Sequence, residues 1–462
     1  MVLSLGKRFR RLNPAQLLIF SFAAYILFIS LILSLPAAAV GEPVSWVQAL
    51  FTATSATCVT GLTVVDTGGK FSLFGQLVIL ASIQLGGIGI MTMSSFILVL
   101  MGRRPSLQAR EAVSSLFPSL ERFTLPRLLV ATIIVTAACE LAGAVLLFAR
   151  WMREIPDPGQ AAYQAVFHSI SAFCNAGLSL NRDNLIPWAA DVTTNFTIMA
   201  LILFGGLGFF VLIEIWSALG RSRRPFLRRF SFHTKLVLTM TLLILVIGTL
   251  FFFLLEQRND QTLKPLGLGQ GLLLSVFQIV TARTAGFNTL PIENLTPACL
   301  YLLIGVMFVG AAPGSCAGGV KVTTAGVLLI VVMSRLRGLG RPTLFGRSLP
   351  RTIIEQSLTL IVLAAVLVAG LLMVLLLTEE GLHPEAVRRG RYFLELAFET
   401  VSAFGTVGLS TGITPRLSNA GMLLISAMMF IGRLGPLTLA YALERHRRKL
   451  AYHYPEESVL IG

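Results

Sequence analysis

Four short segments of the chain each end in a glycine-containing turn that can present backbone oxygens to a cation. Their sequences are FTATSATCVTGL, FHSISAFCNAGL, FQIVTARTAGF and FETVSAFGTVGL. The closing glycines are Gly61, Gly177, Gly286 and Gly408, which are separated by 116, 109 and 122 residues. Glycine allows positive φ and so frees a carbonyl to turn inward, and a ring of carbonyls can replace the water shell of an ion. The spacing predicts four like units around one pore.

Aligned on these glycines, the four turns read CVTG, CNAG, RTAG and GTVG. One such tetrapeptide is a weak signal, but four in register with matching upstream segments are a strong one. Close packing of helices through glycine is the alternative, and it would not repeat the whole block from phenylalanine to glycine. The predicted filter residues are Cys58, Val59, Thr60, Gly61, Cys174, Asn175, Ala176, Gly177, Arg283, Thr284, Ala285, Gly286, Gly405, Thr406, Val407 and Gly408. Arg283 cannot stand in the path of a cation, so we expect its side chain behind the turn as a brace.

A second feature interrupts the long apolar segment that follows the third turn. Between Phe308 and Val320 the chain reads VGAAPGSCAGG. Pro313 lacks a backbone donor and glycines are poor helix formers, so this helix is expected to break below the filter. A fixed kink that accommodates packing is the alternative to a movable gate. The predicted gate residues are Gly310, Ala311, Ala312, Pro313, Gly314, Ser315, Cys316, Ala317, Gly318, Gly319, Lys321 and Arg433.

Charged residues within the apolar segments are candidates for function because charge is costly there. We expect Arg433 to repel cations near the pore axis or to pair with a carboxylate or a loop carbonyl. Snorkelling toward the cytoplasm is the alternative for Arg433 and Lys321. Glu399 begins the fourth short segment and would favour cations or accept backbone donors. Asp66 follows the first turn and would concentrate cations at the mouth or make structural hydrogen bonds.

The elements that position these turns are predicted to be membrane helices. The 462 residues are 55% hydrophobic and 13% charged, with a mean hydropathy of +0.79, which is typical of a polytopic membrane protein. A spanning helix needs about 20 apolar residues, and such a segment precedes and follows each turn. The predicted spans are residues 17–35, 73–101, 128–148, 193–219, 236–255, 298–333, 353–377 and 422–443. The segments before the glycines are too short to cross, so they are expected to enter the membrane and return.

We therefore predict an all-α membrane protein with eight spans. Each repeat comprises a first span (M1), a re-entrant pore helix (P) and a second span (M2), and four M1–P–M2 repeats surround a single pore per protomer with pseudo-fourfold symmetry. The repeats are residues 1–103, 104–222, 223–338 with the broken M2, and 339–462 with a basic C-terminal tail. Because each repeat crosses twice, successive repeats share one orientation, which counts against an inverted-repeat transporter.

The net charge of +15 has a one-sided distribution. Of the 37 Lys and Arg residues, 24 fall in residues 7–11, 103–127, 221–235, 335–351 and 445–449. This asymmetry predicts that both termini are cytoplasmic. A nucleic-acid-binding patch is the disfavoured alternative. Attraction of the basic residues to anionic membrane lipids is compatible with their cytoplasmic placement. The N-terminal segment imitates a secretory signal, but its 19-residue apolar run fills the first-helix position and is expected to be retained.

Enzymatic, metal and disulfide sites are not predicted. The five cysteines form no CxxC pair and support neither a metal site nor a disulfide, and Cys58 and Cys174 share one register of the repeat. We find no nucleophile–base pair and no P-loop. A secondary transporter coupled to Na+ or H+ remains the alternative to a filter-lined pore.

Together these motifs resemble the Trk/Ktr/HKT superfamily of cation-uptake proteins over nearly the whole chain. One span precedes the first filter glycine, as in KtrB-type membrane subunits of bacterial Ktr systems, whereas Trk-type subunits carry an extra helix pair. Gly61, in place of the serine of sodium-preferring plant relatives, implies potassium. The matching sequences are CVTGL (58–62), NAGL (175–178), TARTAGFNT (281–289), PGSCAGGVK (313–321), FGTVGLS (404–410) and GRLGPLT (432–438).

The resemblance implies K+ uptake across a bacterial plasma membrane, with the loop after Pro313 as the gate and Arg433 as its neighbour across the pore. It also implies a homodimer with one pore per protomer, seated on a cytoplasmic ring of KtrA-type subunits that bind ATP or ADP, and stimulation by Na+. No cofactor is expected on this chain. The gate sequence has fewer Gly and Ser residues near its start than is common in relatives, which implies a stiffer gate.

Overall fold

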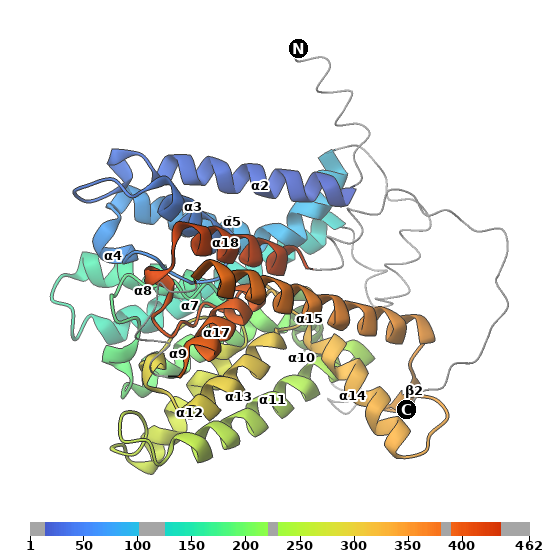
Figure 1. Cartoon of the computed structure of the whole chain (residues 1–462). Coiled ribbons are helices and arrows are strands. Elements are labelled where there is room, and N and C mark those ends of the chain that lie inside the picture. Colours follow the sequence, from blue (N-terminus) through green and yellow to red (C-terminus); the bar gives the residue numbers. More distant parts are fainter. Residues whose placement is uncertain (1–13, 101–124, 220–229, 380–389, 436–462) are drawn as a thin grey trace.

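The computed structural model describes residues 14–100, 125–219, 230–379 and 390–435, and these residues are mostly helical (Figure 1). The longer helices are α2 (Pro14–Leu33), α5 (Leu73–Leu100), α7 (Leu125–Trp151), α9 (Val192–Leu207), α10 (Phe209–Leu219), α11 (Phe232–Glu256), α13 (Pro297–Phe308), α14 (Val322–Leu336), α15 (Arg351–Glu379) and α18 (Asn419–Leu434). The short helices that precede the glycine turns are α3 (Trp46–Thr57), α8 (Pro158–Phe173), α12 (Leu268–Ala282) and α17 (Tyr392–Gly405). Minor helices are α4 (Thr67–Lys70), η1 (Pro36–Ala38), η3 (Ile186–Trp188), η5 (Ile292–Asn294) and η6 (Thr414–Arg416).

Local sequence signals set where the short helices begin. Ser45 and Gln48 form a capping box at the start of α3, so that each side chain accepts from the backbone of the other. Asp157 caps α8 by accepting from the backbone of Gly159 and Gln160. The ends of the four helices are equally regular, because each helix stops at or just before the first residue of a CVTG-like turn. The turn is therefore held at a fixed place relative to its helix.

The four short helices are linked by packing between successive repeats. Helix α5 contacts α8, α9 contacts α12, α13 contacts α17, and α18 contacts α3. Each short helix also contacts the first long helix of its own repeat, in the pairs α2–α3, α7–α8, α11–α12 and α15–α17. Figure 1 shows α3, α8, α12 and α17 among the longer helices, with α2 and α11 at opposite edges of the molecule. The chain of contacts thus returns from the last repeat to the first.

Buried carboxylates join the two long helices within the third and fourth repeats. Glu256, the last residue of α11, accepts hydrogen bonds from the Thr296 backbone nitrogen at 2.8 Å and from its hydroxyl at 2.6 Å. Glu379, the last residue of α15, accepts likewise from Ser418. Thr296 and Ser418 are the N-caps of α13 and α18, and both carboxylates are fully buried. These contacts tie the end of each first long helix to the start of the second.

The second span of repeat two differs from the prediction. A continuous helix over residues 193–219 was expected, but α9 and α10 meet at a bend of 102°. Gly208 lies at the bend with φ +83°, and a Cβ there would lie 2.7 Å from the Pro313 carbonyl oxygen. The Phe209 nitrogen donates to the Gly314 carbonyl oxygen at 3.0 Å. The prediction of a continuous helix is therefore wrong, and the bend lies where Gly208 and Phe209 contact the loop at Pro313 and Gly314.

The described residues are mostly helical, as the all-α prediction expected, and one connector adds a short hairpin that was not predicted. Strands β1 (Thr343–Leu344) and β2 (Arg347–Ser348) form an antiparallel hairpin. Phe345 and Gly346 at its tip have φ of +52° and +73°, which matches the two-residue turn that best follows strand twist. This hairpin carries part of the basic group 335–351. The basic groups 7–11 and 445–449 lie outside the described residues.

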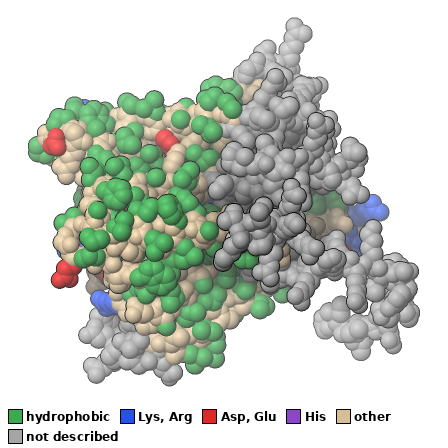
Figure 2. Space-filling model, turned by 90° about the horizontal axis from the view of Figure 1, so that it is seen from above, with side chains coloured by type: hydrophobic (Ala, Val, Ile, Leu, Met, Phe, Trp, Pro, Cys, Tyr) green, Lys and Arg blue, Asp and Glu red, His purple; other side chains and the backbone are tan. Residues whose placement is uncertain are grey.

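The surface of the described helices is largely apolar. Figure 2 shows hydrophobic side chains covering most of the described face, with few charged ones. Among the described residues, three helices are long and apolar enough to cross a membrane: Val130–Trp151, Phe232–Glu256 and Arg351–Glu379. Helices α9 and α10 together would add a fourth, and six further apolar helices are shorter. Such a surface fits lipid contact better than water.

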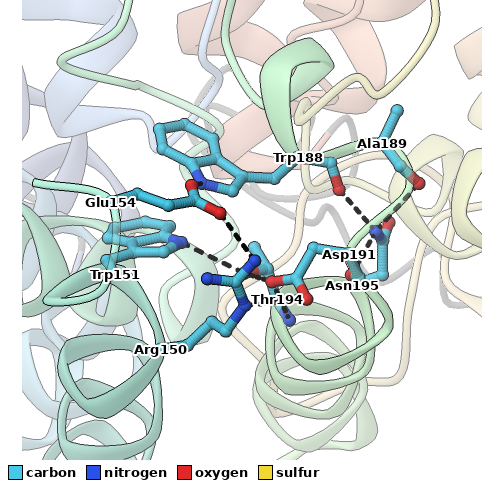
Figure 3. A network of polar contacts seen from close by, with 8 residues as sticks. All are labelled: Arg150, Trp151, Glu154, Trp188, Ala189, Asp191, Thr194 and Asn195. Carbon is cyan, nitrogen blue, oxygen red and sulfur yellow. Dashed lines mark hydrogen bonds and ion pairs between the residues drawn. The ribbon is translucent and has the colours of Figure 1, made fainter.

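A polar network ties α7 to the start of α9 (Figure 3). Arg150 contacts Glu154 at 2.6 Å and Asp191 at 3.0 Å, and Trp151 donates to the Thr194 hydroxyl at 3.0 Å. Asp191 is the N-cap of α9 and accepts from the Thr194 backbone nitrogen at 3.1 Å. Partial burial acts to raise the pKa of Asp191, but the hydrogen bonds from Thr194 and Arg150 outweigh it and hold that pKa below its ordinary value.

We expect Asp191→Ala to destabilise the protein by about 1 kcal/mol at pH 7, because the substitution removes a helix cap. The folded-state pKa is lowered, so the stabilisation is fully present above the ordinary pKa of 3.8 and is lost as the pH falls through the lowered value. Thermal unfolding of the purified protein at pH 7 and at acidic pH tests this. Asp183→Ala, at an exposed position of the same loop, is the control, and an equal effect in both variants would contradict the prediction.

Candidate ion filter and gate

The backbone of each glycine turn adopts the same alternating conformation. The glycine and the residue two positions before it both have left-handed φ, which is uncommon for residues other than glycine. The values are +55° and +98° for Val59 and Gly61, +60° and +64° for Asn175 and Gly177, +79° and +80° for Thr284 and Gly286, and +48° and +92° for Thr406 and Gly408. Unfavourable backbone conformations of this kind concentrate at functional sites. Four separate segments of the chain therefore share one backbone conformation, although the residues in them differ.

The four glycines approach one another in cyclic order. A Cβ placed on Gly61 would lie 3.2 Å from the Gly177 Cα, one on Gly177 would lie 2.7 Å from the Gly286 Cα, and one on Gly286 would lie 3.1 Å from the Gly408 Cα. A Cβ on Gly408 would lie 2.9 Å from the Gly61 Cα. Each added Cβ would also meet the carbonyl oxygen that precedes the next glycine in the cycle. The turns of four distant segments thus share one narrow space lined by backbone.

Hydroxyl groups of the short helices brace these turns, and the sequence analysis did not single them out. The Gly61 nitrogen donates to the Ser55 hydroxyl at 3.1 Å, and the Gly408 nitrogen donates to Ser402 at 3.1 Å. In the other two turns a hydroxyl donates to a carbonyl just beyond the glycine: Ser171 to Leu178 at 2.8 Å and Thr281 to Phe287 at 2.6 Å. A signal was present, because a Ser or Thr stands five or six residues before every filter glycine.

A polar cavity opens beside the glycines. Its volume is about 130 Å³, and all four filter glycines line it together with Asp66, Ser179, Asn181, Asn184, Asn288 and Ser410. Asp66 also caps α4 by accepting from the Gly68 nitrogen at 3.1 Å. The capping contact supports the structural role weighed for Asp66, and its role in concentrating cations stays a prediction. The cavity supplies amide, hydroxyl and carboxylate oxygens, which are the ligands that hard cations prefer.

The side chain of Arg283 contacts a helix outside the glycine turns. Its side chain is buried, and its guanidinium donates to the Thr241 hydroxyl of α11 at 3.2 Å. This contact directs the charge toward the helix behind the turn, as expected for a brace. The Thr60 and Thr284 hydroxyls of the turns are buried without a hydrogen-bond partner in the described part of the chain. Unpaired buried oxygens of this kind require an explanation, and a partly dehydrated cation would supply one.

Glu399 accepts several hydrogen bonds behind the fourth turn. Its fully buried carboxylate accepts from the Ser410 hydroxyl at 2.6 Å, the Thr411 nitrogen at 3.0 Å and the Thr414 hydroxyl at 2.8 Å. These donors all belong to the segment that leads away from the filter. Of the two roles considered for Glu399, the contacts support the acceptance of backbone and hydroxyl donors. The carboxylate thereby fixes the exit of the fourth turn.

The predicted gate residues form a loop pinned to several elements. The ends of the loop pair as Val309 with Val320 in a parallel bridge. Its middle contacts the broken helix of repeat two, where the nitrogen of Cys316 donates to the Gly205 carbonyl at 3.3 Å. The Gly318 nitrogen donates to the Thr406 hydroxyl of the fourth turn at 3.0 Å. The loop therefore lies directly against the fourth glycine turn.

The two cations of the predicted gate bind its carbonyl oxygens. Arg433 is buried and donates to the carbonyls of Cys316 and, at 2.6 Å, of Gly86 in α5. Lys321 donates to the Ala317 carbonyl at 2.6 Å. Pairing with a loop carbonyl was one of the alternatives weighed for Arg433, and the contacts support it over snorkelling. Arg433 thus joins the gate loop to a helix of the first repeat.

Comparison with known proteins identifies the family. A family profile described as "TrkH: Cation transport protein" matches residues 20–447. The chain is 39% identical over 454 residues to Ktr system potassium uptake protein B of Bacillus subtilis, covering 98% of this chain and 97% of the relative. It is 37% identical to the protein of the same name from Vibrio alginolyticus, over 97% of this chain and 94% of the relative.

A solved structure supports the fold. The crystal structure of the potassium transporter TrkH from Vibrio parahaemolyticus superposes with a TM-score of 0.69, covers 92% of this chain and 83% of its own, and shares 18% sequence identity. The relatives are named as transport proteins, and this chain is likewise a transport protein rather than an enzyme. The resemblance inferred from the glycine turns is therefore confirmed, and the chain belongs to the TrkH family of cation transport proteins.

Proposed function

We propose that this chain is a potassium-selective translocation subunit that takes up K+ through a filter of glycine-turn carbonyls. The closed cycle of contacts among Gly61, Gly177, Gly286 and Gly408 carries this proposal. It brings four carbonyl-bearing turns to one point, as dehydration of K+ requires. The potassium uptake named for the relatives from Bacillus subtilis and Vibrio alginolyticus supports the choice of ion.

The proposed architecture is four M1–P–M2 repeats with pseudo-fourfold symmetry and eight spans, divided at residues 103, 222 and 338. The order of helix contacts from α5–α8 to α18–α3 supports it. The gate is the loop from Gly310 to Gly319 with Lys321 and Arg433. Both termini lie in the cytoplasm, and the protein resides in a bacterial plasma membrane.

We further propose that the subunit works as a homodimer on a cytoplasmic KtrA-type ring. The relatives belong by name to Ktr systems, which supports a soluble regulatory component. ATP or ADP would bind to that partner rather than to this chain, and Na+ would stimulate uptake. A second candidate function is Na+- or H+-coupled secondary transport, which gains support from a 35% identical relative of Enterococcus hirae named potassium/sodium uptake protein NtpJ.

The direct test is growth in limiting potassium of a strain that lacks its own potassium systems. We expect expression of this chain with a KtrA-type partner to restore growth, because the partner would release the gate. Rescue without the partner would mean that the gate opens unaided. Absence of rescue in both cases, with folded protein in the membrane, would contradict the ion assignment. A fixed Na+ to K+ stoichiometry in vesicles would instead favour the coupled transporter.

Arg433→Ala is expected to raise K+ uptake in the absence of a partner by about tenfold. The substitution removes the hydrogen bonds that tie the gate loop to α5. If the free energy that favours the closed gate falls by about 1.4 kcal/mol, the open population changes tenfold. The measurement is K+ flux per folded protein. Arg416→Ala, at an exposed position of η6, is the control. Loss of folded Arg433→Ala protein from the membrane would make Arg433 a structural residue instead.

A further inference from the structure

A basic connector joins α14 to α15. Five arginines and a single acidic residue, Glu355, lie between the last turn of α14 and the second turn of α15. The arginines are Arg335, Arg337, Arg341, Arg347 and Arg351, and all five are exposed. Glu355 pairs with Arg351 at 2.9 Å, and the other four guanidiniums form no ion pair within the described part of the chain. The connector therefore presents positive charge that the described carboxylates do not balance.

The backbone of this connector is held in place. The Leu349 nitrogen donates to the Pro342 carbonyl oxygen at 3.0 Å and closes the base of the β1–β2 hairpin. At the tip of the hairpin, the ring of Phe345 packs edge-on against Phe232 in the first turn of α11, with ring centroids 6.2 Å apart. A fixed backbone lowers the entropy cost of binding, so the arginines start from positions that are already arranged.

Apolar side chains continue from the arginines along one face of α15. Arg351, Glu355, Leu358, Val362 and Val366 follow one another at spacings of three or four residues, which places them on the same side of a helix. The three apolar members are 53% to 62% exposed. Helix α15 is long and apolar enough to cross a membrane. This face therefore begins with charge and goes on as open apolar surface.

Helix α14 has a similar face at its other end of the connector. Leu329, Val332 and Leu336 are spaced by three and four residues and are 39%, 53% and 79% exposed. Arg335 lies in the last turn of the same helix, where a cation also interacts favourably with the helix carbonyls. Helices α14 and α15 contact each other. The exposed apolar faces of two packed helices thus reach the same group of arginines.

This combination of groups matches one kind of partner. A guanidinium offers a planar fork of N–H donors that fits two oxygens of a phosphate group. Anionic phospholipids attract basic segments beside membrane helices. An acidic protein surface would match the charge, but it would leave unexplained the exposed apolar residues that continue along a helix of membrane-spanning length. The occupant that satisfies both halves of the surface is a lipid.

We propose that the connector at residues 335–351 binds an anionic phospholipid. The phosphate of the lipid contacts the arginines, and its acyl chains lie along the exposed apolar residues of α14 and α15. Figure 1 shows the hairpin beside the end of α14 at the edge of the molecule, where a lipid can approach it. Binding of this lipid does not depend on which ion the chain carries.

Native mass spectrometry of the full-length protein measures this binding. Protein purified in a neutral detergent is titrated with dioleoyl phosphatidylglycerol, with the zwitterionic dioleoyl phosphatidylcholine or with soluble glycerol phosphate. We expect phosphatidylglycerol to bind about tenfold more tightly than phosphatidylcholine, because only its headgroup carries a net negative charge. Equal binding of the two lipids would overturn the proposal. Glycerol phosphate that binds as tightly as the lipid would also overturn it, since the ligand would then be a free phosphate compound.

Paired substitutions locate the site. Arg337→Gln combined with Arg347→Gln is expected to remove most of the preference for phosphatidylglycerol. Arg153→Gln combined with Arg182→Gln changes the net charge equally at exposed positions outside the connector, and this control is expected to keep the preference. An unchanged preference in the first variant would contradict the proposal and would assign the arginines to another occupant, such as a cytoplasmic protein.

Labelling of the wild-type protein gives an answer that requires no variant to fold. The protein is irradiated with a phosphatidylglycerol that carries a photoreactive diazirine in its headgroup, and the labelled peptides are identified by mass spectrometry. Labelling within residues 335–351 is expected. Labelling that is confined to other segments of the chain would overturn the proposal.

Discussion

Gly408→Ser is expected to lower the K+-over-Na+ selectivity of uptake by about tenfold or more, which corresponds to about 1.4 kcal/mol of differential ion binding. A Cβ at this position would lie 2.9 Å from the Gly61 Cα and would meet the Thr60 carbonyl oxygen. The φ of +92° also disfavours any side chain. The turn must therefore move, and the carbonyl spacing that suits K+ changes with it. Competition of Na+ with K+ uptake measures the effect.

A matched control exists in the same protein. Gly305 of α13 has open space around its added Cβ and an exposed position, so Gly305→Ser is expected to keep wild-type selectivity. Serine at Gly61, Gly177 or Gly286 is expected to act as at Gly408, since each added Cβ meets the next turn. Wild-type selectivity in all four serine variants would refute a filter made of these turns.

Removal of residues 313–317 from the gate loop is expected to raise K+ flux in the absence of a partner. If the open state is populated at about 1–10% in the intact protein, the rise is about 10- to 100-fold. The deletion removes the contacts of the loop with Phe209, Gly205 and Arg433. It leaves Val309 and Val320, whose bridge closes the ends of the loop. Flux in proteoliposomes, corrected for the amount of folded protein, measures the result.

Removal of the hairpin tip, residues 344–347, provides the control for this deletion. It shortens another connector by a similar length but lies away from the filter in Figure 1, so we expect unchanged flux. Unchanged or lower flux in a well-folded variant that lacks residues 313–317 would show that the loop is only a kink. Equal increases in both deletions would point to general loosening of the protein.

Local patterns predicted several elements well. The short helices before Gly61, Gly177, Gly286 and Gly408 are present, because their sequence signals act over a few residues. Two of them, α3 and α8, also have side-chain caps. The interruption after Phe308 is also present, since Pro313 and its neighbouring glycines disfavour a helix wherever they occur. Family membership followed from the same motifs because their order along the chain is specific.

Other features depend on contacts between residues far apart in the chain and were not predicted from the sequence. The bend at Gly208 was missed because a similar glycine cluster, GGIG at residues 86–89, lies within the continuous helix α5. At Gly208 the contacts with Pro313 and Gly314 accompany the bent form. The serine braces at Ser55 and Ser402 were missed because hydroxyls are common in apolar helices. The hairpin was not predicted, because its two-residue tip, Phe345 and Gly346, gives only a short sequence signal between long apolar segments.

The sequence by itself determined the register of the four glycine turns, the apolar character of the long helices and the place of the interruption after Phe308. These follow from residue types and spacing along the chain, which set local conformation and burial. Only the tertiary structure decided which helices meet and where Arg433 directs its charge. One such contact joins Arg433 and Gly86, which are 347 positions apart. No local pattern specifies that partnership, because packing of the whole helical assembly selects it.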